Sequence, residues 1–203
     1  YLFSGLGADE RAFSKLDLNN YEVHYIKWVC PKNQESIAAY AKRICVQIAS
    51  ASPILIGLSF GGIMAIEVSK LIPYKKIILI SSVKTRLEVP WYYRWVGKIG
   101  LHKIIPTSFF KSANLLTYWV FGLKTQQEKS IFKAMLKDSN PLFMRWAIHQ
   151  ILSWENMVIA RNLVHIHGTN DKILPLLFIK NTITIEAGGH FMIWNQAKLI
   201  PID

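Results

Sequence analysis

The chain has 203 residues, of which 51% are hydrophobic and 18% are charged. These proportions exclude a disordered chain and are typical of a single domain with a sizeable buried core. Lys and Arg outnumber Asp and Glu by 24 to 13, which gives a net charge of +11. The basic residues are spread singly among apolar ones and form no basic run, so we expect no nucleic-acid partner.

The sequence gives little indication of membrane insertion or of disulfide bonds. No stretch of about eighteen residues is both apolar and uncharged, so we expect no stable membrane insertion. The two cysteines, Cys30 and Cys45, are too few for a disulfide framework, and we expect reduced thiols, with one bridge between them as the open alternative. We expect a cytoplasmic protein, although the chain starts at Tyr1 and not at Met, so the lack of a signal peptide says little about export.

Strands and helices alternate along most of the chain. Asp9 and Asn33 are placed to cap two helices, and a third helix is predicted from Ile63 to Ile72, before Pro73. The predicted strands cover residues 1–3, 21–29, 54–56, 77–80, 163–168 and 182–186. Such alternation means right-handed crossovers, so the predicted class is α/β with a mostly parallel sheet flanked by helices.

Residues 84–155 interrupt this alternation. They are rich in aromatic residues and predicted to be helical, with a helix start at Asn140 and Pro141. We interpret them as a helical lid over the carboxyl edge of the sheet, inserted between core strands of one domain that spans residues 1–203. Residues 84–150 hold eleven basic and three acidic residues, and we expect these charges to face water while apolar side chains line a pocket.

Residues 53–66 contain the sequence Gly57-Leu58-Ser59-Phe60-Gly61 between a predicted strand and a predicted helix. A strand that turns sharply into a helix through small-x-Ser-x-small is a nucleophile elbow. Glycine on both sides leaves room for the crossing strand and helix, and the turn would expose the Ser59 hydroxyl. The alternative for the pattern alone is a glycine-rich turn with an idle serine.

Two later loops carry an acid and a histidine. His-Gly-Thr-Asn-Asp at residues 167–171 follows the fifth predicted strand, and Ala-Gly-Gly-His-Phe at residues 187–191 follows the sixth. Ser59, Asp171 and His190 therefore each come from a loop at the carboxyl end of a strand, where parallel sheets place their sites. His165 and His167 alternate on one strand, but no ligand set surrounds them, so we expect no metal site.

These three motifs, in this order, resemble the α/β-hydrolase superfamily in its small, lidded form. The resemblance covers nearly the whole chain except the lid. It implies Ser59 as the nucleophile, His190 as the general base and Asp171 as the residue that orients the imidazole. It also implies an oxyanion hole made by the backbone N–H groups of Leu6 and Phe60. No metal or organic cofactor is implied.

Two departures from the resemblance stand out. Members usually have one or two strands before the strand at residues 1–3, so the N-terminal strands here are reduced or missing. The usual His-Gly-x of the oxyanion loop is replaced by Ser4-Gly5-Leu6. For the substrate pocket we expect residues from the lid, namely Trp91, Tyr92, Trp95 and His149.

The expected activity is that of a serine esterase that acts on a small, mostly apolar carboxylic ester. The same triad could instead serve a thioester, a lactone, an amide, a C–C bond or a cyanohydrin. A ligand-binding receptor or an interaction module on the same fold is the alternative from another class. The oligomeric state is not predicted.

Overall fold

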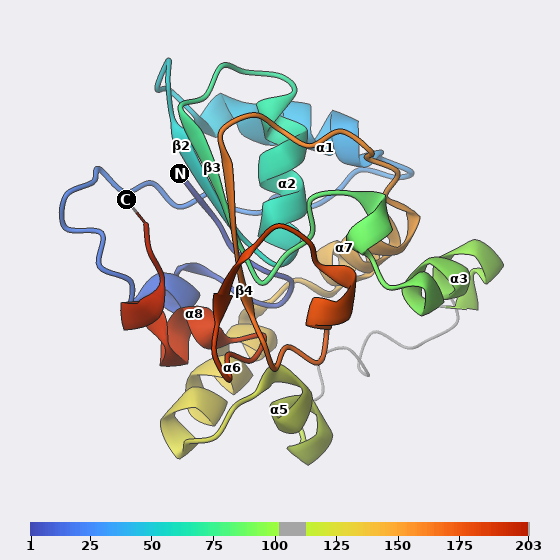
Figure 1. Ribbon diagram of the computed structural model, residues 1–203. Helices are drawn as coiled ribbons and strands as arrows, with labels where there is room; N and C mark the ends of the chain where they lie inside the picture. Colours follow the sequence, from blue (N-terminus) through green and yellow to red (C-terminus); the bar gives the residue numbers. More distant parts are fainter. Residues whose placement is uncertain (102–112, 203) are drawn as a thin grey trace.

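The computed structural model describes residues 1–101 and 113–202 (Figure 1). Its centre is a five-stranded parallel sheet with the strand order β1-β2-β3-β4-β5. The strands are β1 (Leu2–Phe3), β2 (Ile54–Leu58), β3 (Lys76–Ile80), β4 (Leu163–Gly168) and β5 (Ile183–Ile185). This architecture confirms the predicted α/β class with a parallel sheet.

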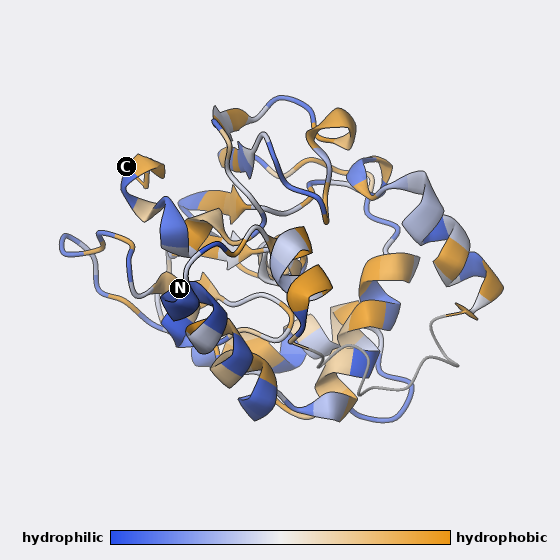
Figure 2. Cartoon of the chain, turned by 90° about the horizontal axis from the view of Figure 1, so that it is seen from below, coloured by the Kyte–Doolittle hydropathy of each residue, from blue (hydrophilic) through white to orange (hydrophobic). Residues whose placement is uncertain are grey.

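Both faces of the sheet are covered, which explains why its central strands are continuous apolar runs. Ile77 and Leu79 of β3 belong to the core on one face, and Ile78 and Ile80 belong to the core on the other. The helices on the first face are α1 (Ile37–Ile44), α2 (Phe60–Ser69) and α7 (Pro141–Ser153), and those on the second include η1 (Glu10–Phe13), α6 (Gln126–Asp138) and α8 (Met192–Asn195). Figure 2 shows hydrophobic strands between helices of mixed hydropathy.

The remaining helical turns are short or lie between β3 and β4. The segment between these strands contains η3 (Arg86–Glu88), α3 (Trp91–Ile99) and α5 (Leu115–Phe121), followed by α6 and α7. Residues 102–112 of the predicted lid lie outside the described residues. Single turns occur at η2 (Cys45–Gln47), η5 (Leu176–Phe178) and η6 (Ala197–Leu199).

Two of the predicted helix caps are confirmed. The Asp9 carboxylate accepts a hydrogen bond from the Arg11 N–H at the start of η1. The Asn140 side chain accepts from the N–H groups of Leu142 and Phe143 at the start of α7. In both cases the side chain satisfies backbone donors that the first turn leaves unpaired.

The predicted cap at Asn33 is wrong, because α1 begins three residues later. Residues 32–35 form a turn in which the Glu35 carboxylate accepts from the Lys32 N–H, and Gln34 has a φ of 53°. The cap of α1 is Ser36, whose hydroxyl accepts from the Ala39 N–H at 3.2 Å. A local side-chain bond that closes the turn therefore prevents the helix from starting at Asn33.

The strand predicted at residues 21–29 is also wrong. It is reduced to a single parallel bridge between Tyr25 and Leu2. Beyond that bridge the backbone bonds to side chains: the Lys27 N–H donates to the Gln47 amide oxygen, and the Val29 N–H donates to the Tyr40 hydroxyl. Because β1 itself has only two residues, no longer ladder exists for this segment to join.

Two expectations made from composition can also be compared with the structure. Cys30 and Cys45 are both free thiols. No helix in the described part of the chain has the length and apolar character needed to cross a bilayer.

Candidate active site

Three side chains from three strand ends form one hydrogen-bonded line. The Ser59 Oγ lies 2.9 Å from His190 Nε2, and His190 Nδ1 lies 2.7 Å from Asp171 Oδ2. Ser59 follows β2, Asp171 follows β4 and His190 follows β5, and all three strands are parallel. Their carboxyl ends therefore meet at one edge, where a serine hydroxyl, an imidazole and a carboxylate are joined by two successive hydrogen bonds.

The backbone at Ser59 is strained. Its φ is 52° and its ψ is −119°, a conformation that costs a residue with a side chain about 1–3 kcal/mol. The turn is possible because the residues two positions before and after Ser59 have no side chains: a Cβ on Gly57 would lie 2.4 Å from the Gly62 Cα, and a Cβ on Gly61 would lie 2.0 Å from the Phe3 carbonyl oxygen. The backbones around the turn consequently pack at van der Waals distance, and Ser59 is the N-cap residue of α2.

The acid loop fixes both oxygens of the Asp171 carboxylate. Its Oδ1 accepts from the Ile173 and Leu174 N–H groups, each at 2.9 Å, and its Oδ2 accepts from His190. Burial alone would raise the pKa of Asp171, but the positive charge and hydrogen bond of His190 outweigh it and lower that pKa below its usual value. The carboxylate is therefore ionised at neutral pH and holds the imidazole in one orientation.

His167 is a second histidine beside the same carboxylate. Its Nε2 lies 2.8 Å from the Leu174 carbonyl oxygen and 3.4 Å from Asp171 Oδ2. Burial lowers the pKa of His167, so the ring is neutral and its Nε2–H donates to the Leu174 carbonyl. His167 thus connects β4 to the turn that carries Asp171.

The two expected oxyanion donors lie beside the serine. Phe60 is the first residue of α2, so its N–H has no partner within the helix. Leu6 follows β1, and Gly5, Leu6 and Ser59 line the same cavity. Neither N–H donates a hydrogen bond within the described part of the chain. The Ser4 side chain, which replaces a histidine in this loop, accepts a hydrogen bond from the Trp28 indole at 2.8 Å.

Behind Ser59 lies a buried polar cluster that the sequence reading missed. The Ser82 hydroxyl donates to the Ser59 carbonyl oxygen at 2.7 Å, and His165 Nε2 lies 3.0 Å from the Ser82 carbonyl oxygen. The Lys84 ammonium lies 2.9 Å from His165 Nδ1 and 2.7 Å from Glu88 Oε1. Burial, together with the Lys84 charge, lowers the pKa of His165 to about 2. The neutral ring therefore donates through Nε2 and accepts through Nδ1.

His165 belongs to this cluster, whereas His167 contacts the turn that carries Asp171. Among the described residues, no group of three His, Cys, Asp or Glu side chains is arranged to hold a metal ion. The only indication of the polar cluster in the sequence was the pattern His-x-His on an otherwise apolar strand. The partners Ser82, Lys84 and Glu88 come from the segment after β3, and no spacing in the sequence connects them with β4.

A small apolar cavity of about 120 Å³ opens onto the Ser59 hydroxyl and the His190 ring. Phe121, at the end of α5, contributes a ring whose edge faces the imidazole, with 5.5 Å between the centroids. The other apolar side chains of the lining come from six elements or loops: Leu6, Ala8, Leu58, Phe132, Met135, Ile151, Ile173 and Phe191. Residues from α5, α6 and α7 thus lie against the site.

The four lid residues expected in the pocket do not line this cavity. Trp91 and Trp95 are 63% and 59% exposed and line a separate surface groove against the end of α7. Tyr92 packs on Tyr93 and Phe178, and His149 lies at a groove between α7 and the loop before α1. Aromatic density in the sequence therefore did not predict which residue of this segment lines the cavity at Ser59, and Phe121 was missed.

The fold is shared with solved structures of low sequence identity. An esterase of Thermogutta terrifontis is 14% identical and has a TM-score of 0.63, over 98% of this chain and 85% of that chain. A carboxylesterase of Nitrososphaera gargenis is 15% identical, with a TM-score of 0.63 over 97% and 84%. A lipase-esterase related protein of Clostridium acetobutylicum is 17% identical, with a TM-score of 0.66 over 97% and 88%.

The chain has the α/β-hydrolase fold. The resemblance first suggested by three short motifs is thereby confirmed at the level of the fold, across nearly the full length of the chain. No protein-family model matches the sequence, and no curated protein sequence matches it either. At 14–17% identity these α/β-hydrolase neighbours carry the fold alone, so the activity has to be argued from the site.

Proposed function

We propose that this protein is a serine hydrolase that cleaves carboxylic esters through an acyl-enzyme. The observation that carries the proposal is the unbroken line from Ser59 Oγ through His190 to Asp171, with separations of 2.9 and 2.7 Å, at a strained strand-to-helix turn. Strain of this kind persists where the surrounding structure holds it for a function. An idle serine would need neither the strained turn nor the aligned histidine.

The reaction follows from the position of each group. Ser59 Oγ attacks the acyl carbon while His190 Nε2 takes the hydroxyl proton, and Asp171 stabilises the imidazolium. The Leu6 and Phe60 N–H groups donate to the negative oxygen of the tetrahedral intermediate. The intermediate collapses, the C–O bond to the alcohol breaks, and the alcohol leaves with the proton from His190. Water then attacks the acyl-Ser59 by the same steps and releases the acid.

The cavity supports a short, apolar acyl group as the substrate class. Its volume of about 120 Å³ and its apolar lining leave little room for a long chain or for an unpaired charge. The neighbours named as esterases are consistent with an ester as the scissile bond. A series of p-nitrophenyl esters of increasing acyl length should show kcat/KM highest for the shortest chains.

The decisive test is Ser59→Ala, with Ser81→Ala as the matched control. Ser81 follows β3 as Ser59 follows β2, has a φ of 47° and is fully buried, but among the described residues its hydroxyl has no hydrogen-bond partner. We expect Ser59→Ala to lower kcat by about 10⁴ to 10⁶ and to abolish fluorophosphonate labelling. Ser81→Ala should keep both.

The opposite labelling result would favour another class of function. If the wild-type protein is not labelled and no ester is cleaved, the hydrogen-bonded line does not make Ser59 nucleophilic. The protein would then be a ligand-binding receptor on a hydrolase fold, and the proposal of an esterase would be wrong.

A further inference from the structure

Helix α3 presents aromatic and aliphatic side chains to solvent. Trp91, Trp95 and Ile99 are 63%, 59% and 51% exposed. Their spacing of four residues places them along one stripe of the helix, about 40° apart. Apolar side chains gathered on one exposed helix face are typical of an interaction site in a soluble protein. The site is separate from the Ser59 cavity, whose lining includes none of the three.

Basic side chains accompany this stripe. Arg86, Arg94 and Lys98 line, together with Trp91 and Trp95, an open groove of about 550 Å³ between α3 and the end of α7. The Nε of Arg94 is buried and has no hydrogen-bond partner among the described residues. An unpaired buried guanidinium N–H is costly and points to an acceptor that the chain itself does not supply.

Acidic residues do not neutralise this surface. Between residues 91 and 137 the sequence has eight Lys or Arg and one acidic residue, Glu128. Glu128 is buried and is used in the capping box of α6. Among the described residues, the only acid in the groove is Glu155, which pairs with Arg86 at 3.1 Å, so neither Arg94 nor Lys98 forms an ion pair there. The complementary partner is therefore anionic.

The combination of side chains identifies the kind of anionic partner. Tryptophan rings prefer the boundary between lipid headgroups and acyl chains, and basic side chains on the same short helix reach the phosphates. Lysine is depleted in protein–protein interfaces, whereas lysine and arginine are each worth about 1 kcal/mol at an anionic lipid surface. An anionic lipid surface thus suits both the exposed tryptophans and the basic side chains of this surface, including Lys98.

We propose that α3 docks the protein on the surface of an anionic lipid bilayer. The helix lies in the plane of the interface, with Trp91, Trp95 and Ile99 at the headgroup level. Arg86, Arg94 and Lys98 contact lipid phosphates, and the groove beside Arg94 receives one headgroup. The protein lies on the membrane and does not cross it. This inference is independent of ester hydrolysis, because it uses no residue of the Ser59 cavity.

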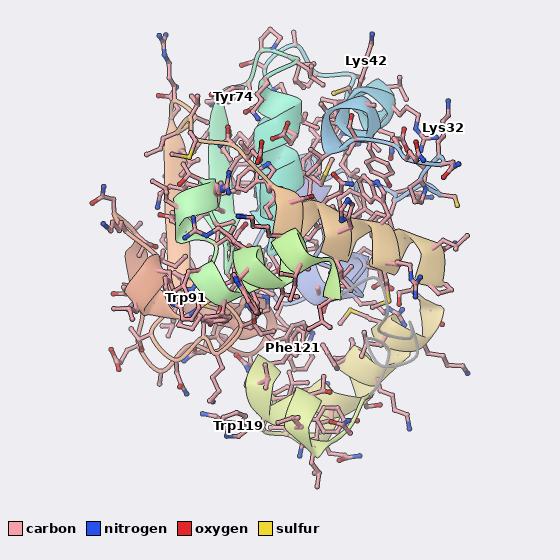
Figure 3. The ribbon with its side chains drawn as sticks, turned by 90° about the vertical axis from the view of Figure 1, so that its right-hand side faces the viewer. Lys32, Lys42, Tyr74, Trp91, Trp119 and Phe121 are labelled. Atoms are coloured by element: carbon pink, nitrogen blue, oxygen red, sulfur yellow. The ribbon has the colours of Figure 1, made fainter. Side chains whose placement is uncertain are left out.

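The test is sedimentation of the protein with vesicles of phosphatidylcholine alone or with one part in three of phosphatidylglycerol. The variants are Trp91→Ala/Trp95→Ala and Arg94→Gln/Lys98→Gln. The control is Lys42→Gln/Val46→Ser, which changes one exposed lysine and the 86% exposed Val46 at or just after α1. Figure 3 shows Lys42 at the top of the view, well away from Trp91.

We expect the wild-type protein and the control to bind the anionic vesicles and to release them at high salt. Removal of two positive charges should weaken the partition constant about 25-fold, or about fivefold for each charge. Removal of both tryptophans should weaken it at least about tenfold. All variants should keep the wild-type thermal unfolding midpoint within a few degrees, since the other changed side chains are exposed and the buried Nε of Arg94 makes no hydrogen bond among the described residues that could be lost.

Three results would overturn the proposal. The first is equal binding to neutral and anionic vesicles, and the second is an equal loss of binding in the control variant. The third is no vesicle binding but salt-sensitive binding to poly-glutamate, which would assign the surface to an acidic protein. None of these results depends on activity, because the same measurements apply to the Ser59→Ala protein.

Discussion

The carboxyl edge of the sheet and helix α3 use polar and aromatic side chains in opposite ways. At the sheet edge Asp171, His190 and His165 are buried, and their partners come from within the chain. On α3 the Trp91 and Trp95 rings are exposed, and the buried Nε of Arg94 has no partner among the described residues. In the first region, hydrogen bonds within the chain hold Ser59, His190 and Asp171 in one geometry, as chemistry at a fixed position requires. The second region is the surface that we propose to dock on an anionic bilayer.

Asp171→Asn tests the rigid region with the largest expected effect. The amide cannot accept the His190 Nδ1 proton in the same way, so the imidazole loses the orientation in which Nε2 faces Ser59. We expect kcat/KM for a short p-nitrophenyl ester to fall by about 10⁴. Glu186→Gln is the control, because Glu186 is an exposed carboxylate in the same loop as His190. Comparable losses in both variants would show that the assignment of Asp171 is wrong.

His165→Gln tests whether the buried cluster behind Ser59 behaves as one neutral, fully paired unit. Because burial lowers the pKa of His165 to about 2, the unfolded chain, with a histidine pKa of about 6.5, binds the extra proton between these values. The free energy of unfolding should therefore fall as the pH drops below about 6.5, by up to about 1.4 kcal/mol per pH unit for this residue.

Glutamine can reproduce both bonds of the neutral ring, by donating to the Ser82 carbonyl and accepting from Lys84. We expect His165→Gln to reduce the pH slope of denaturant unfolding between pH 5 and 6.5 by about one proton, while His167 retains its own share. An unchanged slope would mean that His165 takes up a proton in the folded protein, and the proposed neutral cluster would be incorrect.

Helix α5 has one side chain in the Ser59 cavity and another exposed to solvent, so the two can be compared within one helix. Phe121 lines the Ser59 cavity, whereas Trp119 is 61% exposed (Figure 3). Phe121→Ala removes apolar contact with the substrate and should lower kcat/KM about tenfold or more, mainly through KM. Trp119→Ala loses a cation–π contact with Lys172 and should change the free energy of unfolding by less than about 1 kcal/mol, with kcat/KM unchanged. Similar kinetic losses in both variants would mean that the cavity extends over the outer face of α5.

The sequence by itself determined the α/β class, all five strands of the sheet, two helix caps and the order of Ser59, Asp171 and His190. These features depend on local patterns: apolar runs for buried strands, glycine where the backbone crosses closely, and side chains that cap the first turn of a helix. Because the strands are parallel, the sequence also indicated that the three residues would meet at one edge. The sequence was sufficient to predict a feature wherever that feature depends on contacts between residues close together in the chain.

Only the tertiary structure decided the rest. Whether residues 21–29 form a strand depends on Gln47 and Tyr40, which take the backbone bonds that a ladder would need. Which aromatic residue of the lid meets His190 depends on how α3 and α5 pack, and their amphipathic patterns alone do not distinguish Phe121 from Trp95. The connection from Glu88 through Lys84, His165 and Ser82 to the back of Ser59 joins residues up to 106 positions apart, counted from Ser59 to His165. Such contacts arise from the crossing of strands and loops in space, and no spacing along the chain encodes them.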